Sequence, residues 1–386
     1  MSPQHAPRKR AAPEESDKPL KRRSRRPRRR QPKDADRGVE ASPDRPPRAR
    51  HEALAHLQHS QASYACAYST ASAKWSTVPD AEPARDDEKR GIASSLNLVT
   101  FNTWSSAPEH THSQTTAVLD LLAGARADIV ALQEVSKPFE STLRKQRWVQ
   151  AEWVLTSLDE YWRVAGKDGQ GKGKKPAKRE GVVVMLKKDL WSYGCKVGFV
   201  RLKRANNEQA KALVTLRIVR EGSELLRIAT SHFSSLPQNA RLRRSQYSIA
   251  LSMLNASPRA SHSILLGDFN ASSSLELDVV SAQLRDVGPV PSKSQLAELS
   301  SREEKEDLAF RHRPTFGALY PLVSLDASKP RRPRRIDRIY VSKGTKSSHY
   351  RELGDEAIPG EKDKLGKGGK RYPSDHLAVG VRVSLE

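Results

Sequence analysis

The sequence is poor in cysteine and holds no long apolar run. Its 386 residues include two cysteines, Cys66 and Cys195, which are too few for a framework of disulfide bonds. No stretch approaches the roughly 18 apolar residues of a membrane-spanning helix, and no apolar segment follows the N-terminal charges as a secretory signal requires. These absences predict a soluble protein of a reducing compartment.

Motifs for several cofactor chemistries are also missing. The chain has no glycine-rich phosphate loop, no zinc-spaced set of Cys and His, no dinucleotide fingerprint and no internal repeat. The chemistries that depend on those motifs are therefore set aside.

Basic residues are abundant. The chain holds 68 Lys and Arg against 45 Asp and Glu, a net charge of +23, and residues 1–50 carry +10 of it. Those residues are rich in proline and poor in large apolar groups, so they cannot bury enough surface to offset the entropy of ordering. We predict a disordered basic arm and linker over residues 1–90. The charge on the rest predicts an anionic partner, nucleic acid first, with solubility alone as the alternative.

Two basic clusters in the arm resemble a bipartite nuclear import signal. Lys9 and Arg10 are followed by Lys21, Arg22 and Arg23 and then by SRRPRRR. The acidic residues in PEESD argue against a mitochondrial transit peptide. We predict a nuclear location and an import receptor as partner. The alternative is a polycation that coats any polyanion.

From Ser94 onward, apolar runs of strand length, such as LNLVTF and SILLG, alternate with amphipathic stretches such as NARLRRSQYSIALSML. This alternation predicts an α/β domain over residues 91–386. Three hydrophilic segments rich in Lys and Arg, beginning at Gly166, Ser328 and Gly360, interrupt the pattern, and their Gly and Pro content marks them as loops.

Polar residues stand at the ends of five apolar runs: Asn102, Glu134, His232, Asp268 with Asn270, and Asp375 with His376. Each has a plain structural alternative, because Gly-Asp-x-Asn is ordinary turn chemistry, a terminal Glu can cap a segment, and a single His is more often structural. Together, carboxylates, amides and imidazoles fit metal-assisted phosphodiester hydrolysis better than acyl transfer, which needs a Ser or Cys nucleophile and an oxyanion hole.

Six motifs carry a family resemblance. TFNTW, LQEV, TSHF, GDFN, RIDRIYV and PSDH follow in this order over about residues 94–386, and here the chain resembles the endonuclease/exonuclease/phosphatase superfamily. The resemblance implies a four-layer sandwich of two packed mixed β-sheets flanked by helices. Within the superfamily, the chain is most similar to the tyrosyl-DNA phosphodiesterase 2 enzymes, which release tyrosine from DNA 5′ ends. This similarity rests on SHF with Arg243 and Gln246 in the helix behind it, on IDRIY, and on YPSDH near the C-terminus.

The resemblance also implies roles for individual residues. Glu134 would bind Mg²⁺, with Mn²⁺ as the alternative, and Asn102 beside it would contact the metal shell or the phosphate. Asp337 would be a further acid near the metal, or a structural partner of Arg338. Asp268 would activate the attacking water, and Asn270 would position the water or the phosphate. His376 would stabilise the developing charge, and His232 would be a second histidine near the scissile phosphate. Asp375 would support the site. Ser374 would be a turn residue.

Two segments depart from the pattern of the vertebrate enzymes. FNTWSS stands where they have WNIDG, and HFSS stands where they have HLES, so Ser234 replaces a Glu. The metal and water residues survive both changes. The departures bear on the substrate, because the segment after the first Asn helps to shape the substrate groove.

The basic loops before RIDRIY and YPSDH are expected close to the catalytic face. Phosphate backbones bind such loops through counterion release, whereas the alternative is a solvated surface. We predict substrate contacts from five basic residues: Arg243, Arg334, Arg335, Lys370 and Arg371.

These observations predict a monomeric, Mg²⁺-dependent phosphodiesterase that acts on DNA, at 5′-tyrosyl ends, and does not bind membranes. An abasic-site endonuclease or an RNA 3′ exonuclease of the same fold is the nearer alternative. Basic charge argues against inositol phosphatase or sphingomyelinase activity. A nucleic-acid-binding protein on an inactive catalytic fold is the alternative from another class.

Overall fold

The computed structural model describes residues 65–79, 94–165, 179–204, 208–220, 222–256, 260–320 and 333–386. The basic arm and the predicted import signal lie outside these residues, as do most of the loop from Gly166 and most of the loop from Ser328. The last residue of the first of these loops, Glu180, begins a strand. Within the described ranges, no helix is long and apolar enough to cross a membrane.

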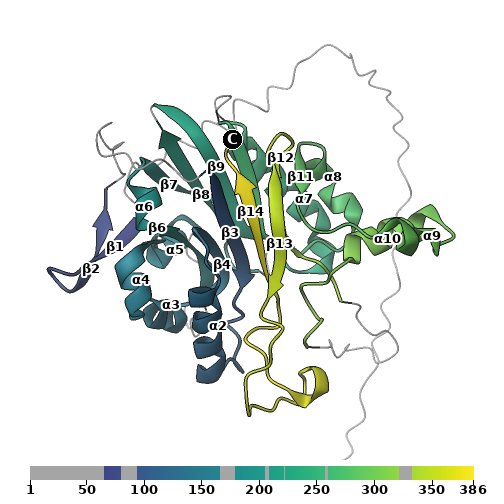
Figure 1. Ribbon diagram of the computed structural model, residues 1–386, viewed down its shortest axis with the longest axis horizontal. Coiled ribbons are helices and arrows are strands. Elements are labelled where there is room, and N and C mark those ends of the chain that lie inside the picture. Colours follow the sequence, from purple (N-terminus) through teal and green to yellow (C-terminus); the bar gives the residue numbers. More distant parts are fainter. Residues whose placement is uncertain are drawn as a thin grey trace, which may run out of the picture. The chain divides into compact units, whose positions relative to one another are not determined.

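Two mixed β-sheets form the centre of the fold (Figure 1). The eight-stranded sheet has the order β13 (Ser347–Leu353), β14 (Ala378–Ser384), β3 (Ser95–Asn102), β4 (Ile129–Ser136), β6 (Glu180–Lys187), β5 (Trp153–Thr156), β1 (Ala65–Ser69), β2 (Lys74–Val78). The six-stranded sheet has the order β11 (Leu284–Asp286), β12 (Asp337–Ser342), β10 (His262–Asp268), β9 (Ser223–His232), β8 (Ala212–Arg220), β7 (Cys195–Arg201). The pairs β3–β4 and β9–β10 are parallel and the other pairs antiparallel.

Helices flank both sheets, which confirms the predicted α/β sandwich. They are α2 (His112–Gly124), α3 (Lys137–Arg144), α4 (Arg147–Glu152), α5 (Leu158–Ala165), α6 (Lys188–Trp191), α7 (Ala240–Leu254), α8 (Ser274–Ser281), α9 (Lys293–Ala297) and α10 (Arg302–Arg311), with short 3₁₀ turns η2 (Pro237–Asn239) and η3 (Lys367–Gly369). In Figure 1, α2 to α5 lie on the side of the larger sheet, and α7 and α8 on the side of the smaller one.

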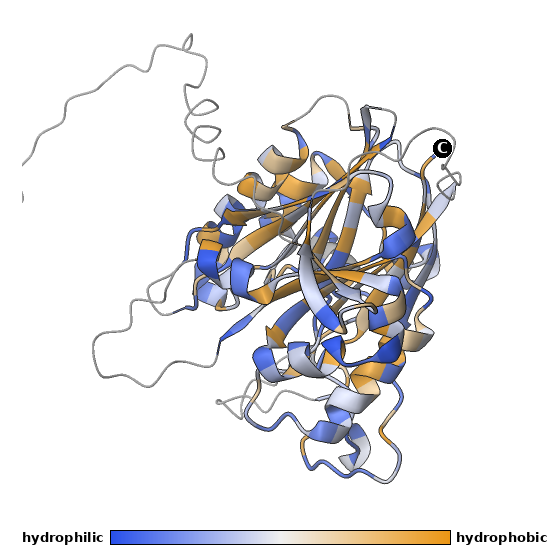
Figure 2. Ribbon diagram, turned by 90° about the vertical axis from the view of Figure 1, so that its left-hand side faces the viewer, coloured by the Kyte–Doolittle hydropathy of each residue, from blue (hydrophilic) through white to orange (hydrophobic). Residues whose placement is uncertain are grey.

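The main core lies where the inner faces of the two sheets meet. Leu98 and Val183 of the larger sheet and Ile228 and Ile264 of the smaller one are buried in one cluster, and apolar colour follows these strands in Figure 2. Each such side chain contributes roughly 1.5–3 kcal/mol when fully buried. A second cluster, with Tyr247, Phe269 and other apolar residues, packs α7 and α8 on the outer face of the smaller sheet.

Local sequence explains why the flanking helices form where they do. Thr111 starts α2 with a capping box: its Oγ1 accepts from the Gln114 backbone N–H at 3.2 Å, and its own N–H donates to the Gln114 side chain at 3.1 Å. On α7, the buried residues Tyr247, Ala250 and Leu254 recur at helical spacing and face the sheet.

Residues 65–78 correct the prediction of a linker over residues 51–90. They form the hairpin β1–β2, and β1 also pairs with β5, with Ala65 opposite Thr156. Trp75 fixes the hairpin, because its indole N–H donates to the Arg144 carbonyl at 3.1 Å and the Arg144 guanidinium lies 4.9 Å from its ring centroid. The larger sheet therefore begins before Ser94.

Candidate active site

The polar residues at the strand ends gather at one edge of the two sheets. In the smaller sheet, Asp268 ends β10, with His232 opposite it on β9 and Asp337 opposite it on β12. In the larger sheet, Asn102 ends β3 and pairs with Gln133, the residue before Glu134. Strand register therefore places these side chains as neighbours.

Asn102 joins the two sheets. Its Nδ2 donates to Glu134 Oε1 and to Asp268 Oδ2, both at 3.0 Å, and its Oδ1 accepts from the Trp104 backbone N–H at 3.0 Å. The residue is completely buried. One amide thus fixes the two carboxylates at a constant separation, and the Trp104 N–H fixes the amide.

His376 and Asp337 form the first carboxylate–histidine pair. His376 Nδ1 lies 2.7 Å from Asp337 Oδ2, and both residues are buried. Burial alone would lower the pKa of His376, but the carboxylates of Asp337 and Asp375 raise it to about 10. The imidazole is therefore a cation near neutral pH and presents its Nε2 side toward Asp375, 3.8 Å away. Burial raises the pKa of Asp375 to about 7.

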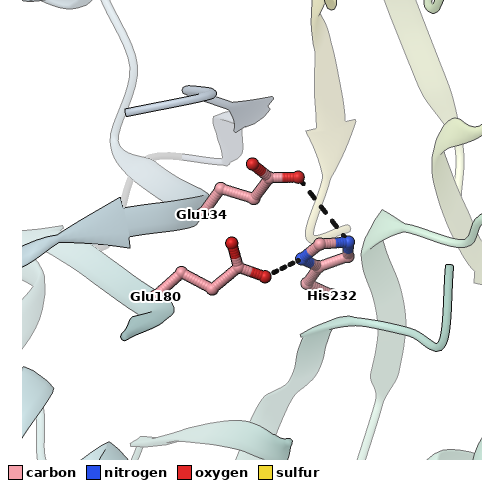
Figure 3. Close-up of side chains that lie close together, drawn as sticks. All are labelled: Glu134, Glu180 and His232. Atoms are coloured by element: carbon pink, nitrogen blue, oxygen red, sulfur yellow. Dashed lines mark ion pairs between the residues drawn. The ribbon is translucent and has the colours of Figure 1, made fainter. Parts of the chain in front are cut away.

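His232 and Glu180 form the second pair (Figure 3). His232 Nδ1 lies 3.4 Å from Glu180 Oε1, and Nε2 lies 3.6 Å from Asp268 Oδ2 and 3.9 Å from Glu134 Oε1. Burial and the Lys211 charge lower the pKa of His232, but Glu180, Asp268 and Glu134 raise it above its ordinary value.

Glu180 is a site residue that the sequence did not reveal. Burial would raise its pKa, yet His232 and Lys211 lower the pKa to about 2. Ser106 Oγ is 2.7 Å from Glu180 Oε2 and 3.1 Å from Glu134 Oε2, so it bridges the two carboxylates. Lys211 is buried, with its Nζ 3.9 Å from Glu180 Oε1.

Two groups of side chains suit a metal ion. Glu134, Glu180 and His232 form one, and Asp268, Asp337 and His376 form the other; in each, the possible ligand atoms lie within 4.8 Å of one another. Carboxylate oxygens dominate both groups, which is the chemistry that hard divalent cations prefer. Asp337 Oδ1 is buried and has no hydrogen-bond partner among the described residues. The donor set therefore fits a divalent cation.

Strained backbone surrounds these groups. Trp104, Glu134 and Asn270 all have positive φ, at 52°, 53° and 50°, which residues other than glycine seldom adopt. Gly267 has φ 136°, and a Cβ there would lie 2.3 Å from the Ser231 carbonyl oxygen. Such strain persists only where the surroundings enforce it, and it concentrates at functional sites.

A comparison with known protein families agrees with this geometry. The model of the Endonuclease/Exonuclease/phosphatase family matches residues 99–376, a span that includes every residue of the two carboxylate–histidine groups. The chain belongs to this family. Its members hydrolyse phosphoester bonds, and the two metal-suited groups accord with the divalent metals that the family uses.

Several solved structures are similar to this family member. TDP2 from C. elegans matches at 16% identity and TM-score 0.50, over 75% of this chain and 75% of that one. D. rerio TDP2 complexed with a single-strand DNA product matches at 18% identity and TM-score 0.50, over 76% and 100%. The human Nocturnin catalytic domain with bound sulfate matches at 16% identity and TM-score 0.47, over 75% and 93%. No curated protein sequence matches the chain.

Asn270 and Ser374 have local roles in this family member's site. The Asn270 N–H donates to Asp268 Oδ1 at 2.9 Å, which is the turn contact considered as the alternative, and its Nδ2 donates to the Phe233 carbonyl at 3.1 Å. Ser374 Oγ donates to the Asn102 carbonyl at 2.8 Å and accepts from the His376 N–H at 3.2 Å. Ser374 is therefore a turn residue, as its sequence context predicts.

The structure gives Arg243 and Arg335 structural roles in place of the predicted substrate contacts. Arg243 is completely buried and its donors are used by Glu276, Ser272 and backbone carbonyls. Arg335 is buried and donates to Asp286 at 3.0 Å and to the Pro289 carbonyl at 3.2 Å. The prediction failed because Glu276 and Asp286, the acids that pair with these two arginines, lie in other segments of the chain and are not visible in the motifs themselves.

The other basic residues remain at the surface. The Arg334 guanidinium lies 5.5 Å from the Phe316 ring, and that ring lies 4.8 Å from the His376 imidazole, so Arg334 reaches the catalytic region. Lys370 is exposed. Arg371 lies 3.5 Å from Asp363 and 3.8 Å from Glu361, which neutralise its charge locally.

Proposed function

We propose that this phosphoesterase hydrolyses phosphodiester bonds in DNA with the help of Mg²⁺, and that its substrate is a 5′ end carrying a tyrosyl adduct. One observation supports the phosphodiesterase part of the proposal. Asn102 hydrogen-bonds to both Asp268 and Glu134, and the His376–Asp337 pair lies beside them. This arrangement offers a base, an amide that positions, and a buried cation facing one region.

Each residue has a distinct task in the proposed reaction. Asp268 orients a water molecule and takes its proton as the water attacks phosphorus, while the bond from phosphorus to the tyrosyl oxygen breaks and tyrosine leaves as its phenolate. The His376 imidazolium, held by Asp337, donates toward a phosphate oxygen as negative charge develops there. His232, held by Glu180, donates to a second phosphate oxygen. A divalent cation bound by Glu134 would neutralise charge on the phosphate.

The DNA substrate is supported by charge and by the motif resemblance. The chain carries a net charge of +23, which attracts phosphate backbones. The D. rerio protein of the same fold was crystallised with a single-strand DNA product. Because FNTWSS and HFSS depart from the vertebrate motifs, the adduct at the 5′ end is the part of the proposal that most needs a test.

The test compares three labelled oligonucleotides, with a 5′-phosphotyrosyl end, an internal abasic site or a 3′ oligo(A) tail, each with Mg²⁺ and with EDTA. We expect Mg²⁺-dependent release of tyrosine, reduced by roughly 100-fold or more in Asp268→Asn. Asp278→Asn, an exposed carboxylate on α8, is the matched control and should behave as wild type.

The other outcomes each have a meaning. Cleavage of the abasic site or of the tail alone would move the substrate to another branch of the family and refute the tyrosyl proposal. No turnover of any of the three would favour a phosphoinositide substrate or an inactive nucleic-acid-binding protein.

We further propose that the arm directs the protein to the nucleus through Lys9–Arg10 and the cluster that begins at Lys21. Replacing Lys21, Arg22 and Arg23 by alanine in a fluorescent fusion of the full chain should reduce the nuclear fraction. An unchanged distribution would leave the arm as a general polycation.

A further inference from the structure

A cavity lies at the end of β3 opposite to the end that carries Asn102. Its volume is about 420 Å³, and it is lined by Asn97, Arg126, His349, Tyr350, Arg351, Val381 and Arg382. We call it the arginine pocket. Asn97 is five residues before Asn102 on β3, which at about 3.3 Å per residue separates the pocket from the site by roughly 16 Å along the strand.

Three arginines from three elements meet in the arginine pocket. Arg126 follows α2, Arg351 belongs to β13, and Arg382 belongs to β14. None of the lining residues is acidic. Within the part of the chain that the structure describes, none of the three arginines forms an ion pair, in contrast to Arg144, whose guanidinium pairs with Glu140 at 2.9 Å. Asp128 lies beside the lining, where its Oδ2 accepts from the Asn97 backbone N–H at 2.7 Å and from the Asn97 side chain at 3.3 Å, so the three guanidinium groups outnumber this neighbouring carboxylate.

Neutral groups hold two of the guanidinium groups in place. Arg351 Nη2 donates to the Ala125 carbonyl at the end of α2, and Arg382 Nε donates to Asn97 Oδ1 at 3.2 Å. Each contact uses one N–H and leaves others in a fixed plane. Guanidinium groups oriented in this way suit bidentate contacts to phosphate.

The backbone around the arginine pocket is shaped to present these side chains. The pairing of β13 with β14 shifts between Ser348 and Arg351, and His349 in this bulge has φ 55°. Bulges re-aim the side chains beside them. Arg126 has φ 48°. A Cβ at Gly380 would lie 2.9 Å from Arg351 Nε, so the glycine makes room for the Arg351 side chain to lie across β14.

The geometry points to a binding site in the arginine pocket for a phosphate-bearing small molecule of about nucleotide size. The volume falls in the range of small-molecule sites, roughly 300–1,000 Å³. The arginines supply phosphate contacts, and Tyr350 lines the same pocket, where it can contact the rest of the ligand. The Tyr350 hydroxyl is 3.3 Å from Glu352 Oε1 and its side chain packs against the main core, so the residue is held in place at the wall of the pocket.

Two kinds of phosphate-bearing ligand have this size: a free nucleotide and the terminal nucleotide of a nucleic-acid strand. Calorimetric titration of the full chain in EDTA, which suppresses metal-dependent binding at the active site, separates them with three probes. The probes are inorganic pyrophosphate, adenosine diphosphate and a 5′-phosphorylated decanucleotide. The tested protein is the Arg126→Gln and Arg382→Gln double variant, because both side chains are exposed and their loss should not disturb folding.

We expect adenosine diphosphate to bind the wild type, and the double variant to bind it about tenfold or more weakly, since charge-assisted hydrogen bonds are lost. Arg147→Gln, an exposed arginine on α4, should bind as wild type. Phosphodiester hydrolysis should be unchanged in the double variant, because neither arginine belongs to the active site.

One further outcome would identify the ligand as a strand end, and two others would overturn the inference. Tighter binding of the decanucleotide than of adenosine diphosphate, lost in the double variant, would assign the pocket to a strand end. The inference is overturned if the wild type binds none of the probes below about 1 mM, or if the double variant binds them as wild type does.

Discussion

The most informative single residue is Asp337, because it holds His376 and lies beside Asp268 on the neighbouring strand. Asp337→Asn keeps the shape but removes the charge that stabilises the imidazolium. We expect this variant and His376→Gln each to lower kcat by roughly 100- to 1,000-fold, the range found when one transition-state donor is lost.

The Asp337–His376 pair should act as a unit. The double variant should then lose little more activity than His376→Gln alone, because residues that work together are non-additive. Steady-state kinetics on the cleaved oligonucleotide measures this. Fully additive losses would show that Asp337 acts through the metal rather than through His376.

His110 gives a prediction for stability against pH. Burial lowers its pKa to about 4, its Nδ1 has no hydrogen-bond partner among the described residues, and its Nε2 lies 3.0 Å from Thr115 Oγ1. Between pH 6.5 and pH 4, His110 therefore binds a proton in the unfolded chain but not in the folded one. The free energy of unfolding is therefore highest above pH 6.5 and decreases as the pH falls toward 4.

Allowing for partial exposure of the ring, this loss should be about 2 kcal/mol in the free energy of unfolding. His110→Gln should lose that much less stability between pH 7 and pH 4 than the wild type, as measured by urea denaturation at each pH. His112→Gln, at an exposed position on α2, should follow the wild-type curve. Parallel curves for all three proteins would contradict the prediction.

Among the elements, α7 and α8 are joined by the buried pair of Arg243 and Glu276. Arg243 Nε donates to Glu276 Oε2 at 2.6 Å, and its Nη1 donates to the carbonyls of Ser234 and Leu236 at 3.0 and 2.7 Å. Arg243→Ala would leave the buried Glu276 carboxylate without its cation, with only the Ser272 donors remaining, and would remove the guanidinium donor of the Ser234 carbonyl. We expect it to lower the free energy of unfolding by about 3–5 kcal/mol.

Arg244 is the matched control on α7, since it is the next residue along the helix and is exposed. Arg244→Ala should change stability by no more than about 0.5 kcal/mol. Chemical denaturation measures both variants. If Arg243→Ala is as stable as wild type but binds DNA less well, the substrate role predicted from the motif would be restored.

The elements that the sequence predicted are those with a strong internal signal. Runs such as LNLVTF and SILLG are mostly apolar because β3 and β10 are buried on both faces over most of their length. The polar residues at their ends mark Asn102 and Asp268 without any knowledge of neighbouring strands. The hairpin β1–β2 has no such signal, since β2 is largely exposed and its main anchor, Trp75, depends on Arg144 far along the chain.

The residues of the candidate site also divide into those that the sequence predicted and those that it did not. Glu180 and Lys211 were missed because each stands at the start of a run beside basic or polar residues, where a charge is expected on the surface. Glu180 becomes a site residue because β6 runs antiparallel to β4, which brings the start of β6 beside Glu134. Lys211 precedes β8, and the pairing of β8 with β9 brings it near the end of β9, where His232 lies. Strand order is a tertiary property, and local pattern does not encode it.

For the whole molecule, charge is the property that connects arm, domain and substrate. Residues 1–50 carry +10 of the net +23, so an arm that contacts the phosphate backbone would release counterions in addition to those released by the catalytic domain. The logarithm of the affinity for a DNA strand should then fall linearly with the logarithm of salt concentration.

Deleting residues 1–50 should make that salt dependence shallower by roughly 0.7 for each lost contact to a single strand. Fluorescence anisotropy with Asp268→Asn, in which turnover is expected to be slower by roughly 100-fold or more, measures the slope for the full chain and for the deletion variant. Cleavage at saturating substrate should be equal in the two proteins, because the arm adds attraction and no catalytic group. If both proteins give the same slope, the arm does not contact DNA, and its basic clusters would then be left to nuclear import alone.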